Sequence, residues 1–176
     1  TNIEGVVLPD DETLGYNSTV TFEEPTWEYG TFEGWSVNED TNPYNTDGYY
    51  DKDTTIYVKD LVGNAVNGEI QLYAVWKLNN NVVKDDTIVA DFNQPIKLDP
   101  YAMGDHEALM NHAKNICKDY TVAFTGEGLY GGFKLNADNT ITYTPNQIML
   151  GVDTVNVSIT LDYGYGDSSK QTFTST

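Results

Sequence analysis

FEGW (32–35) and LYAVW (72–76) are the two stretches of sequence that decide the fold of the first half of this chain. The second stretch closes an alternating run, residues 70–76, and alternation at period two predicts a strand with one buried face. The residues expected on the buried face are Ile70, Leu72, Ala74 and Trp76. Those expected on the other face are Gln71, Tyr73 and Val75.

An opening F-x-G-W and a closing L-Y-A-x-W resemble the Listeria–Bacteroides repeat, the family that includes the B-repeats of internalin-type surface proteins. The resemblance implies a β-grasp-like fold for residues 1–77 and a place on a bacterial cell surface. No amphipathic helix is predicted between the motifs, where residues 36–53 form a longer polar insert than is usual in the family.

Further strands and turns fill the first half. Residues 20–22 and 31–35 are expected to be extended, and residues 54–59 alternate in the manner of a strand. Asn67 and Gly68 form a strong signal for a tight turn just before the closing strand.

A composition change after Trp76 predicts a domain boundary. Residues 78–86 read LNNNVVKDD, a polar stretch that we interpret as a linker. The sequence therefore predicts a first domain over residues 1–77 and a second over residues 87–176.

One helix is predicted in the second domain, over residues 105–120. Its apolar residues recur at helical spacing and form a single stripe: Leu109, Ala113, Ile116, Cys117 and Tyr120. Asp105 is the expected N-cap. Residues 87–99 read as a strand with an edge position or a bulge at Pro95.

The rest of the second half is predicted to be β. Strands are expected over residues 122–124, 132–135, 140–143 and 154–163, and the last of these alternates without a fault. NTITYTPN (139–146), then Gly151, Asp153 and the final alternating strand, resemble the closing hairpin of bacterial cadherin-like and Ig-like domains. VADFNQPIKLD (89–99) resembles their first strand. The resemblance implies a β-sandwich in which the helix is an insert, so the fold class is expected to be mainly β.

Charge narrows the range of partners. The net charge is −18, from 27 acidic residues against nine bases, all lysine. Nucleic acids and anionic membranes attract basic surfaces, so neither is an expected partner. No apolar run reaches the roughly 20 residues that cross a bilayer, and membrane insertion is not expected. With one cysteine, no disulfide can form within the chain. The isolated fragment is expected to be a monomer.

No catalytic residues are predicted, and we expect no enzyme activity. His106 and His112 are six positions apart on the predicted helix, so they point to different faces. Cys117 falls on the apolar stripe of that helix, where a buried thiol behaves as a small hydrophobic group. No cofactor is expected, except that carboxylates could bind calcium. The candidate ligands are Asp85, Asp86, Asp91 and Asp153, although no D-x-D-x-D-G loop is present.

Aromatic residues form the candidate ligand site. Trp35 and Trp76 belong to the repeat motifs and are expected in the core. Other aromatic residues lie in polar or loop contexts, where they could stack on sugar rings or anchor a protein: Trp27, Tyr29, Tyr44, Tyr49 and Tyr50.

These observations predict a non-enzymatic stalk or adhesion module of an extracellular protein, attached to the cell wall of a Gram-positive bacterium. The alternative is a direct binding module that uses the loop aromatics of the first domain. Its partners would be glycans or proteins of a host or of the cell wall.

Overall fold

The computed structural model describes residues 6–21, 23–45, 47–83, 85–100, 106–148 and 150–176. The chain divides into two compact units, Thr1–Asn79 and Asn80–Thr176. The division falls within the predicted linker, but this segment is packed: Leu78 is buried at the end of a strand, and Val82 is buried in a 3-10 helix, η2 (Asn80–Val82). The extent of the two domains stays a prediction.

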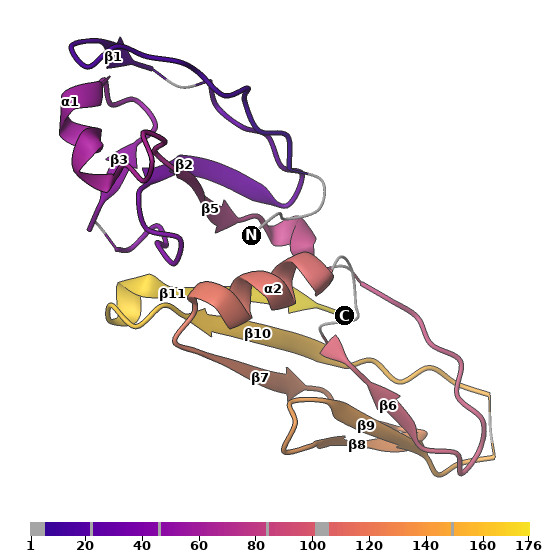
Figure 1. Ribbon diagram of the computed structural model, residues 1–176. Helices are drawn as coiled ribbons and strands as arrows, with labels where there is room; N and C mark the ends of the chain where they lie inside the picture. Colours follow the sequence, from indigo (N-terminus) through magenta and orange to yellow (C-terminus); the bar gives the residue numbers. More distant parts are fainter. Residues whose placement is uncertain (1–5, 22, 46, 84, 101–105, 149) are drawn as a thin grey trace. The chain divides into compact units, whose positions relative to one another are not determined.

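Unit 1 contains a three-stranded and a two-stranded antiparallel sheet (Figure 1). The first has the order β3 (Tyr49–Asp51), β2 (Gly30–Ser36) and β5 (Tyr73–Leu78). The second pairs β1 (Thr19–Val20) with β4 (Ile56–Tyr57).

A β-bulge explains the spacing of the FEGW motif. Phe32 lies opposite Trp76 and Gly34 opposite Val75, so Glu33 is the extra residue in β2. A bulge changes which side chains share a face, and here Phe32 and Trp35 pack edge to face with ring centroids 5.2 Å apart. Phe32 also contacts Trp76, at 5.7 Å. The two motifs therefore meet as one aromatic core, as expected for Trp35 and Trp76.

The glycine of the motif is required by its neighbours. A Cβ atom at Gly34 would overlap the backbone oxygen of Tyr50 and would lie 2.9 Å from the Tyr49 ring. The Tyr49 hydroxyl donates a hydrogen bond of 2.6 Å to the carbonyl of Glu33. Tyr49 thus covers Gly34 and ties β3 to the bulge.

Strand β5 is buried on both faces, which corrects the one-faced strand expected over residues 70–76. Val75 is as buried as Trp76. Val75 lies opposite Gly34 in the ladder, and the Tyr49 ring packs against Gly34. Tyr49 therefore covers this second face of the sheet. Residues 70–72 lie before β5 and carry Ile70 and Leu72 against a separate small core of Val20, Ile56 and Leu61.

Residues 54–59 form less strand than their alternation suggests. After β4 the chain turns into α1 (Val58–Leu61) and the 3-10 helix η1 (Val62–Asn64), although no helix was expected between the motifs. Val58 and Leu61, three positions apart, are both buried, and burying them together requires a helical turn. The Asn67–Gly68 turn is confirmed: both residues have positive φ, and Val66 pairs with Glu69.

Unit 2 contains two three-stranded antiparallel sheets (Figure 1). One has the order β11 (Lys170–Ser175), β10 (Asn156–Asp162) and β7 (Asp119–Thr125). The other has the order β6 (Ile96–Leu98), β9 (Ile141–Pro145) and β8 (Gly131–Leu135). Strand β10 confirms the expected alternation, because Val157, Ile159 and Leu161 are buried.

The helix of unit 2, α2 (His106–Ile116), is shorter than the predicted 105–120. Tyr120 lies in β7 instead, opposite Leu161 of β10. Pairing with β10 satisfies the backbone from Asp119 onward, and this outweighs continuing the helix for one more turn. Asp105, the expected N-cap, lies outside the described residues.

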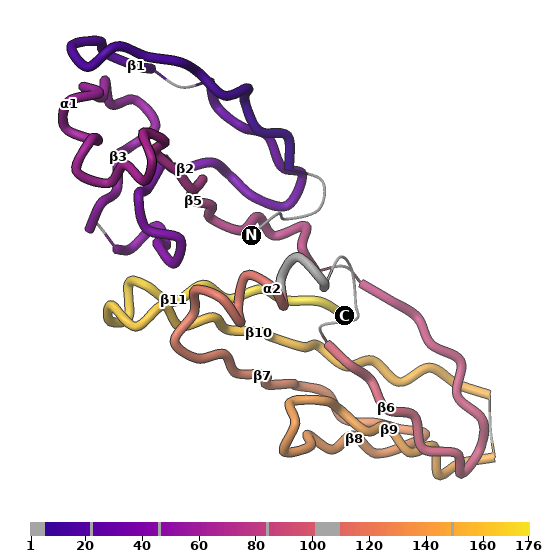
Figure 2. Tube along the Cα trace, viewed as in Figure 1, coloured from indigo at the N-terminus to yellow at the C-terminus, as the bar shows by residue number. Residues whose placement is uncertain are grey.

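The strand predicted over residues 87–99 is mostly irregular. Only β6 forms a ladder, and it begins directly after Pro95. Because proline has no N–H to donate, the ladder starts beyond it. Residues 87–95 run along unit 2, turn, and return as β6 (Figure 2).

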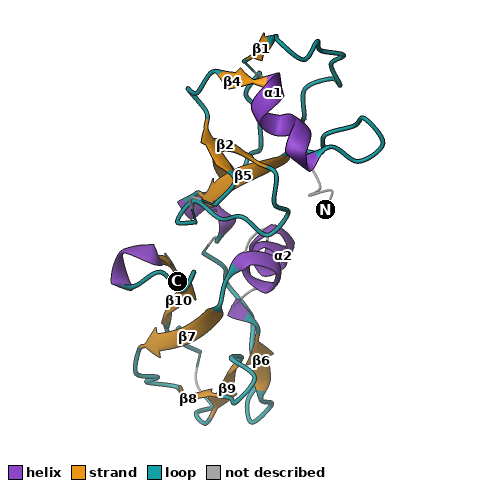
Figure 3. Cartoon of the chain, turned by 60° about the vertical axis from the view of Figure 1, so that its left-hand side comes forward, coloured by secondary structure: helices purple, strands orange, loops and turns teal. Residues whose placement is uncertain are grey.

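The expectation of a mainly β chain is confirmed. Strands account for 37% of it, in several small antiparallel sheets, with two short α-helices and brief 3-10 segments among the described residues (Figure 3). Neither of these helices has the length and apolar character needed to cross a membrane.

Candidate functional site

The predicted aromatic ligand site is largely built into unit 1. Trp27 is buried, and its ring packs edge to face against Trp76 at 5.6 Å and against Tyr29 at 6.1 Å. No described residue accepts a hydrogen bond from the Trp27 indole N–H. Trp27 therefore belongs to the aromatic core, which corrects its placement among exposed loop residues.

The four tyrosines of that set are half-buried. Tyr49 covers Gly34, and burial together with the negative charges of Asp51 and Glu33 raises its pKa to about 12. Tyr50 packs against the Val20 core. Tyr29 contacts Trp27, and Tyr44 is half-buried like the other tyrosines. The set is therefore not the fully exposed aromatic surface on which sugar rings stack most readily.

The calcium candidates do not converge. Asp85 accepts a hydrogen bond from the Thr176 N–H at 2.7 Å, and Asp86 accepts one from the Thr87 N–H at 2.7 Å. Asp91 is exposed, and the Asp153 carboxylate accepts a hydrogen bond from the Leu129 N–H in a different loop. Within the described ranges, no group of three or more His, Cys, Asp or Glu residues could hold a metal ion.

A buried polar cluster holds α2 against the sheet of unit 2. The Nε2 atom of His112 lies 2.7 Å from the Tyr163 hydroxyl, which also donates to Gln171 Oε1 at 3.3 Å. Burial lowers the pKa of His112 to about 3. Burial raises the pKa of Cys117 to about 12, despite a hydrogen bond with Tyr163. A neutral histidine and a protonated thiol suit packing, because nucleophilic cysteines need a lowered pKa.

A shallow polar groove lies on the outer face of the β7–β10–β11 sheet. It is lined by Asp119, Tyr120, Thr121, Thr160, Asp162 and Lys170. Lys170 pairs with Asp167 at 2.7 Å, and the threonines pair across strands, as on many exposed sheets. The groove offers no convergent set of reactive groups.

The most organised loops lie at the opposite end of unit 2 from α2. Asp153 fixes them: its carboxylate accepts hydrogen bonds from the N–H groups of Leu129 (2.6 Å) and Tyr130 (3.0 and 3.1 Å). The Tyr143 hydroxyl donates a further bond of 2.7 Å. Although burial opposes ionisation, these bonds hold the pKa of the Asp153 carboxyl below its usual value.

Close packing fixes the same loops further. A side chain at Gly151 would overlap the Tyr130 ring, and one at Gly128 would overlap the carbonyl of Gly131. The Asn146 N–H donates to the carbonyl of Tyr130 at 2.8 Å. The Asn93 N–H donates to the carbonyl of Pro145 at 3.1 Å. Three segments distant in sequence are thus held together.

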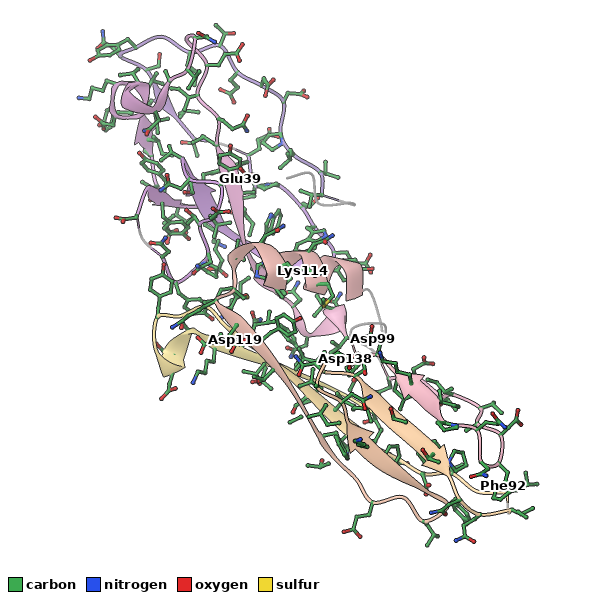
Figure 4. The ribbon with its side chains drawn as sticks, turned by 60° about the horizontal axis from the view of Figure 1, so that its bottom comes forward. Glu39, Phe92, Asp99, Lys114, Asp119 and Asp138 are labelled. Atoms are coloured by element: carbon green, nitrogen blue, oxygen red, sulfur yellow. The ribbon has the colours of Figure 1, made fainter. Side chains whose placement is uncertain are left out.

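We call this region the loop end of unit 2: residues 91–94, 127–131, 145–148 and 150–153. It exposes five large apolar side chains, which we call the apolar set, with exposed fractions from 48% to 103%: Phe92, Leu129, Ile148, Leu150 and Val152. Figure 4 shows Phe92 at this end, remote from Lys114 on α2. Apolar side chains gathered on exposed loops mark interaction sites more often than scattered ones do.

Sequence reasoning missed this site, although a signal was present. IMLGV (148–152) is an apolar run between Gln147 and Asp153, shortly after the segment that ends at Pro145. Within this stretch, the resemblance to a closing hairpin draws only on Gly151. The exposure of Ile148, Leu150 and Val152 is visible only in the folded chain.

Comparisons of the chain with protein-family models, with curated proteins and with solved structures found no match.

Proposed function

We propose that this chain is a non-enzymatic adhesion module of an extracellular bacterial surface protein. The observation that carries the proposal is the loop end of unit 2, where the apolar set is exposed on loops fixed by Asp153. Rigid apolar anchors bind protein surfaces well because little conformational entropy is lost on contact. The high negative charge suits an extracellular, soluble surface.

The finer fold assignment forms part of this proposal. Unit 1 would be a Listeria–Bacteroides-type repeat with a β-grasp-like fold, which the meeting of its two motifs supports. Unit 2 would be a cadherin-like or Ig-like sandwich. The contact between Phe124 of β7 and Phe133 of β8, 6.2 Å apart, supports it by joining the two sheets.

Attachment of coated beads would test the proposal. Beads carrying the chain covalently should adhere to epithelial monolayers several-fold more than beads carrying an unrelated acidic protein. Beads carrying the Leu150→Ser/Val152→Ser variant should lose this adhesion. The matched control is Val62→Ser/Val66→Ser, which removes two exposed valines of unit 1 and should adhere normally. Equal adhesion by both variants would exclude the loop end as the adhesive surface.

The location also stays a proposal. A wall-attached Gram-positive protein would place this chain outside the cell, where an antibody against unit 1 should label intact bacteria. Labelling only after lysis would contradict it.

A further inference from the structure

We propose that the loop end of unit 2 docks a protein segment whose apolar side chains are flanked by lysine or arginine. The inference rests on the proposed function, because it concerns the same surface and names the chemistry of its partner.

Hydrogen bonds and close packing hold the backbone beside the apolar centre of the surface. Asp153 holds the segment of Leu129, and Gly151 lies against Tyr130 beside Leu150 and Val152. Leu150 is fully exposed, and Ile148 and Val152 are each about four-fifths exposed. Leu150 and Val152 flank Gly151, which is packed against the Tyr130 ring, so an apolar partner surface can cover them without reordering the backbone of residues 150–153.

The surroundings of this centre carry one sign of charge. Residues 91–95, 126–131 and 145–155 contain three acidic residues and no lysine: Asp91, Glu127 and Asp153. Asp91 is adjacent to Phe92, and Glu127 is two positions before Leu129; both acids are exposed. Asp153 keeps its charge because its hydrogen bonds hold its pKa low.

An apolar centre with a charged border is the usual arrangement of a protein interface. Complementary charge at the border speeds association and selects the partner. Here the complement is a basic border around an apolar centre.

The same charges disfavour other occupants. A second copy of this chain would bring acidic borders together, in a protein that already carries −18. An anionic bilayer would be repelled for the same reason. A protein segment with apolar side chains flanked by basic ones complements both the apolar centre and its acidic border.

Three fluorescent 15-residue amphipathic peptides provide the test: leucine with lysine, leucine with glutamine, and leucine with glutamate. Fluorescence anisotropy with the whole chain should show binding in the order lysine, glutamine, glutamate. Leu150→Ser/Val152→Ser should weaken lysine-peptide binding at least about tenfold, because the apolar anchors are removed. Asp91→Asn/Glu127→Gln should weaken it about threefold or more at low salt.

A charge-matched control separates local from general attraction. Glu23→Gln/Glu24→Gln removes two exposed charges from unit 1 and should change binding less than twofold. If it weakens binding as much as the Asp91 and Glu127 changes do, the attraction is general and the inference is overturned.

The remaining outcomes distinguish the inference from the proposed function. Equal binding of the lysine and glutamine peptides, lost in Leu150→Ser/Val152→Ser, would overturn the charge of the partner but keep the adhesive surface. No peptide binding together with no bead adhesion would overturn both. Stronger binding to phosphatidylcholine vesicles, or a dimer in sedimentation that the same variant abolishes, would replace the protein segment with a membrane or a second copy.

Discussion

Single residues fix the two features on which this account depends. In unit 1, Gly34 leaves room for Tyr49 to cover the bulge that joins FEGW to LYAVW. In unit 2, Asp153 collects backbone N–H groups from one loop and a hydroxyl from β9. Both residues act by fixing the positions of the groups that pack against them. For each, a control substitution is possible elsewhere in the same unit.

Gly34→Ala should destabilise unit 1 by about 3 kcal/mol, because the new methyl group overlaps the backbone of Tyr50. Gly63→Ala is the control, since no atom lies within 4 Å of a Cβ atom placed there. Chemical denaturation followed by tryptophan fluorescence measures the difference. Similar unfolding midpoints for both variants would show that Tyr49 and β3 do not pack over Gly34.

Asp153→Asn should destabilise the loop end by about 2 kcal/mol, because an amide cannot accept the bonds that both carboxylate oxygens now accept. Amide hydrogen exchange should rise at Leu129 and Tyr130. Asp91→Asn, at an exposed position, should leave exchange at both residues unchanged. Unaltered exchange in Asp153→Asn would contradict the assigned role.

His112 should make folding sensitive to mild acid. Its pKa is about 3 in the folded chain against an ordinary 6.5, so the unfolded chain binds the proton more readily. The stabilisation is complete above pH 6.5 and is lost as the pH falls toward 3, which amounts to about 2 kcal/mol by pH 5. Tyr163 and Gln171 are the hydrogen-bonded neighbours, and Cys117, which bonds the same tyrosine, stays protonated in this range because its pKa is raised to about 12.

The measurement is the free energy of unfolding at several pH values between 5 and 7, for the native chain and for His112→Gln. Falling pH also relieves the charge of −18, but it does so equally in both proteins. The native chain should therefore lose stability relative to His112→Gln. Parallel curves would mean that His112 is accessible to solvent.

Among the helices, strands and turns, the sequence correctly predicted those that depend only on neighbouring residues. The Asn67–Gly68 turn needs only its own two residues in positive φ, and β10 needs only its alternation. The predicted helix was wrong at Tyr120, where pairing with distant Leu161 decides the structure. Of the strand predicted over residues 87–99, only residues 96–98 form a ladder, because a strand-like sequence cannot by itself supply a pairing partner.

The candidate site shows the same limit. Trp27 lies in a polar stretch of sequence, yet its partners Tyr29 and Trp76 bury it. The loop end needs three distant segments to be joined by Asp153 and by backbone hydrogen bonds. Neither contact is encoded in local periodicity, so the sequence could predict aromatic and acidic candidates but not which of them remain exposed.

At the scale of the whole molecule, calcium should contribute no stability. Among the described residues, no group of three or more His, Cys, Asp or Glu could hold a metal ion, and the Asp85 and Asp86 carboxylates accept hydrogen bonds from backbone N–H groups. Addition of millimolar calcium, compared with chelator, should leave the melting temperature unchanged within about 1 °C. A rise of several degrees would reveal a site formed outside the described residues.

The loop end of unit 2 is the proposed adhesive surface of this chain. Its most direct test is the number of coated beads that remain on an epithelial monolayer after washing. We predict that Leu150→Ser/Val152→Ser reduces adhesion to the level of an unrelated acidic protein, while Val62→Ser/Val66→Ser adheres as the native chain does. Undiminished adhesion by Leu150→Ser/Val152→Ser, with its fold intact by circular dichroism, would contradict the account.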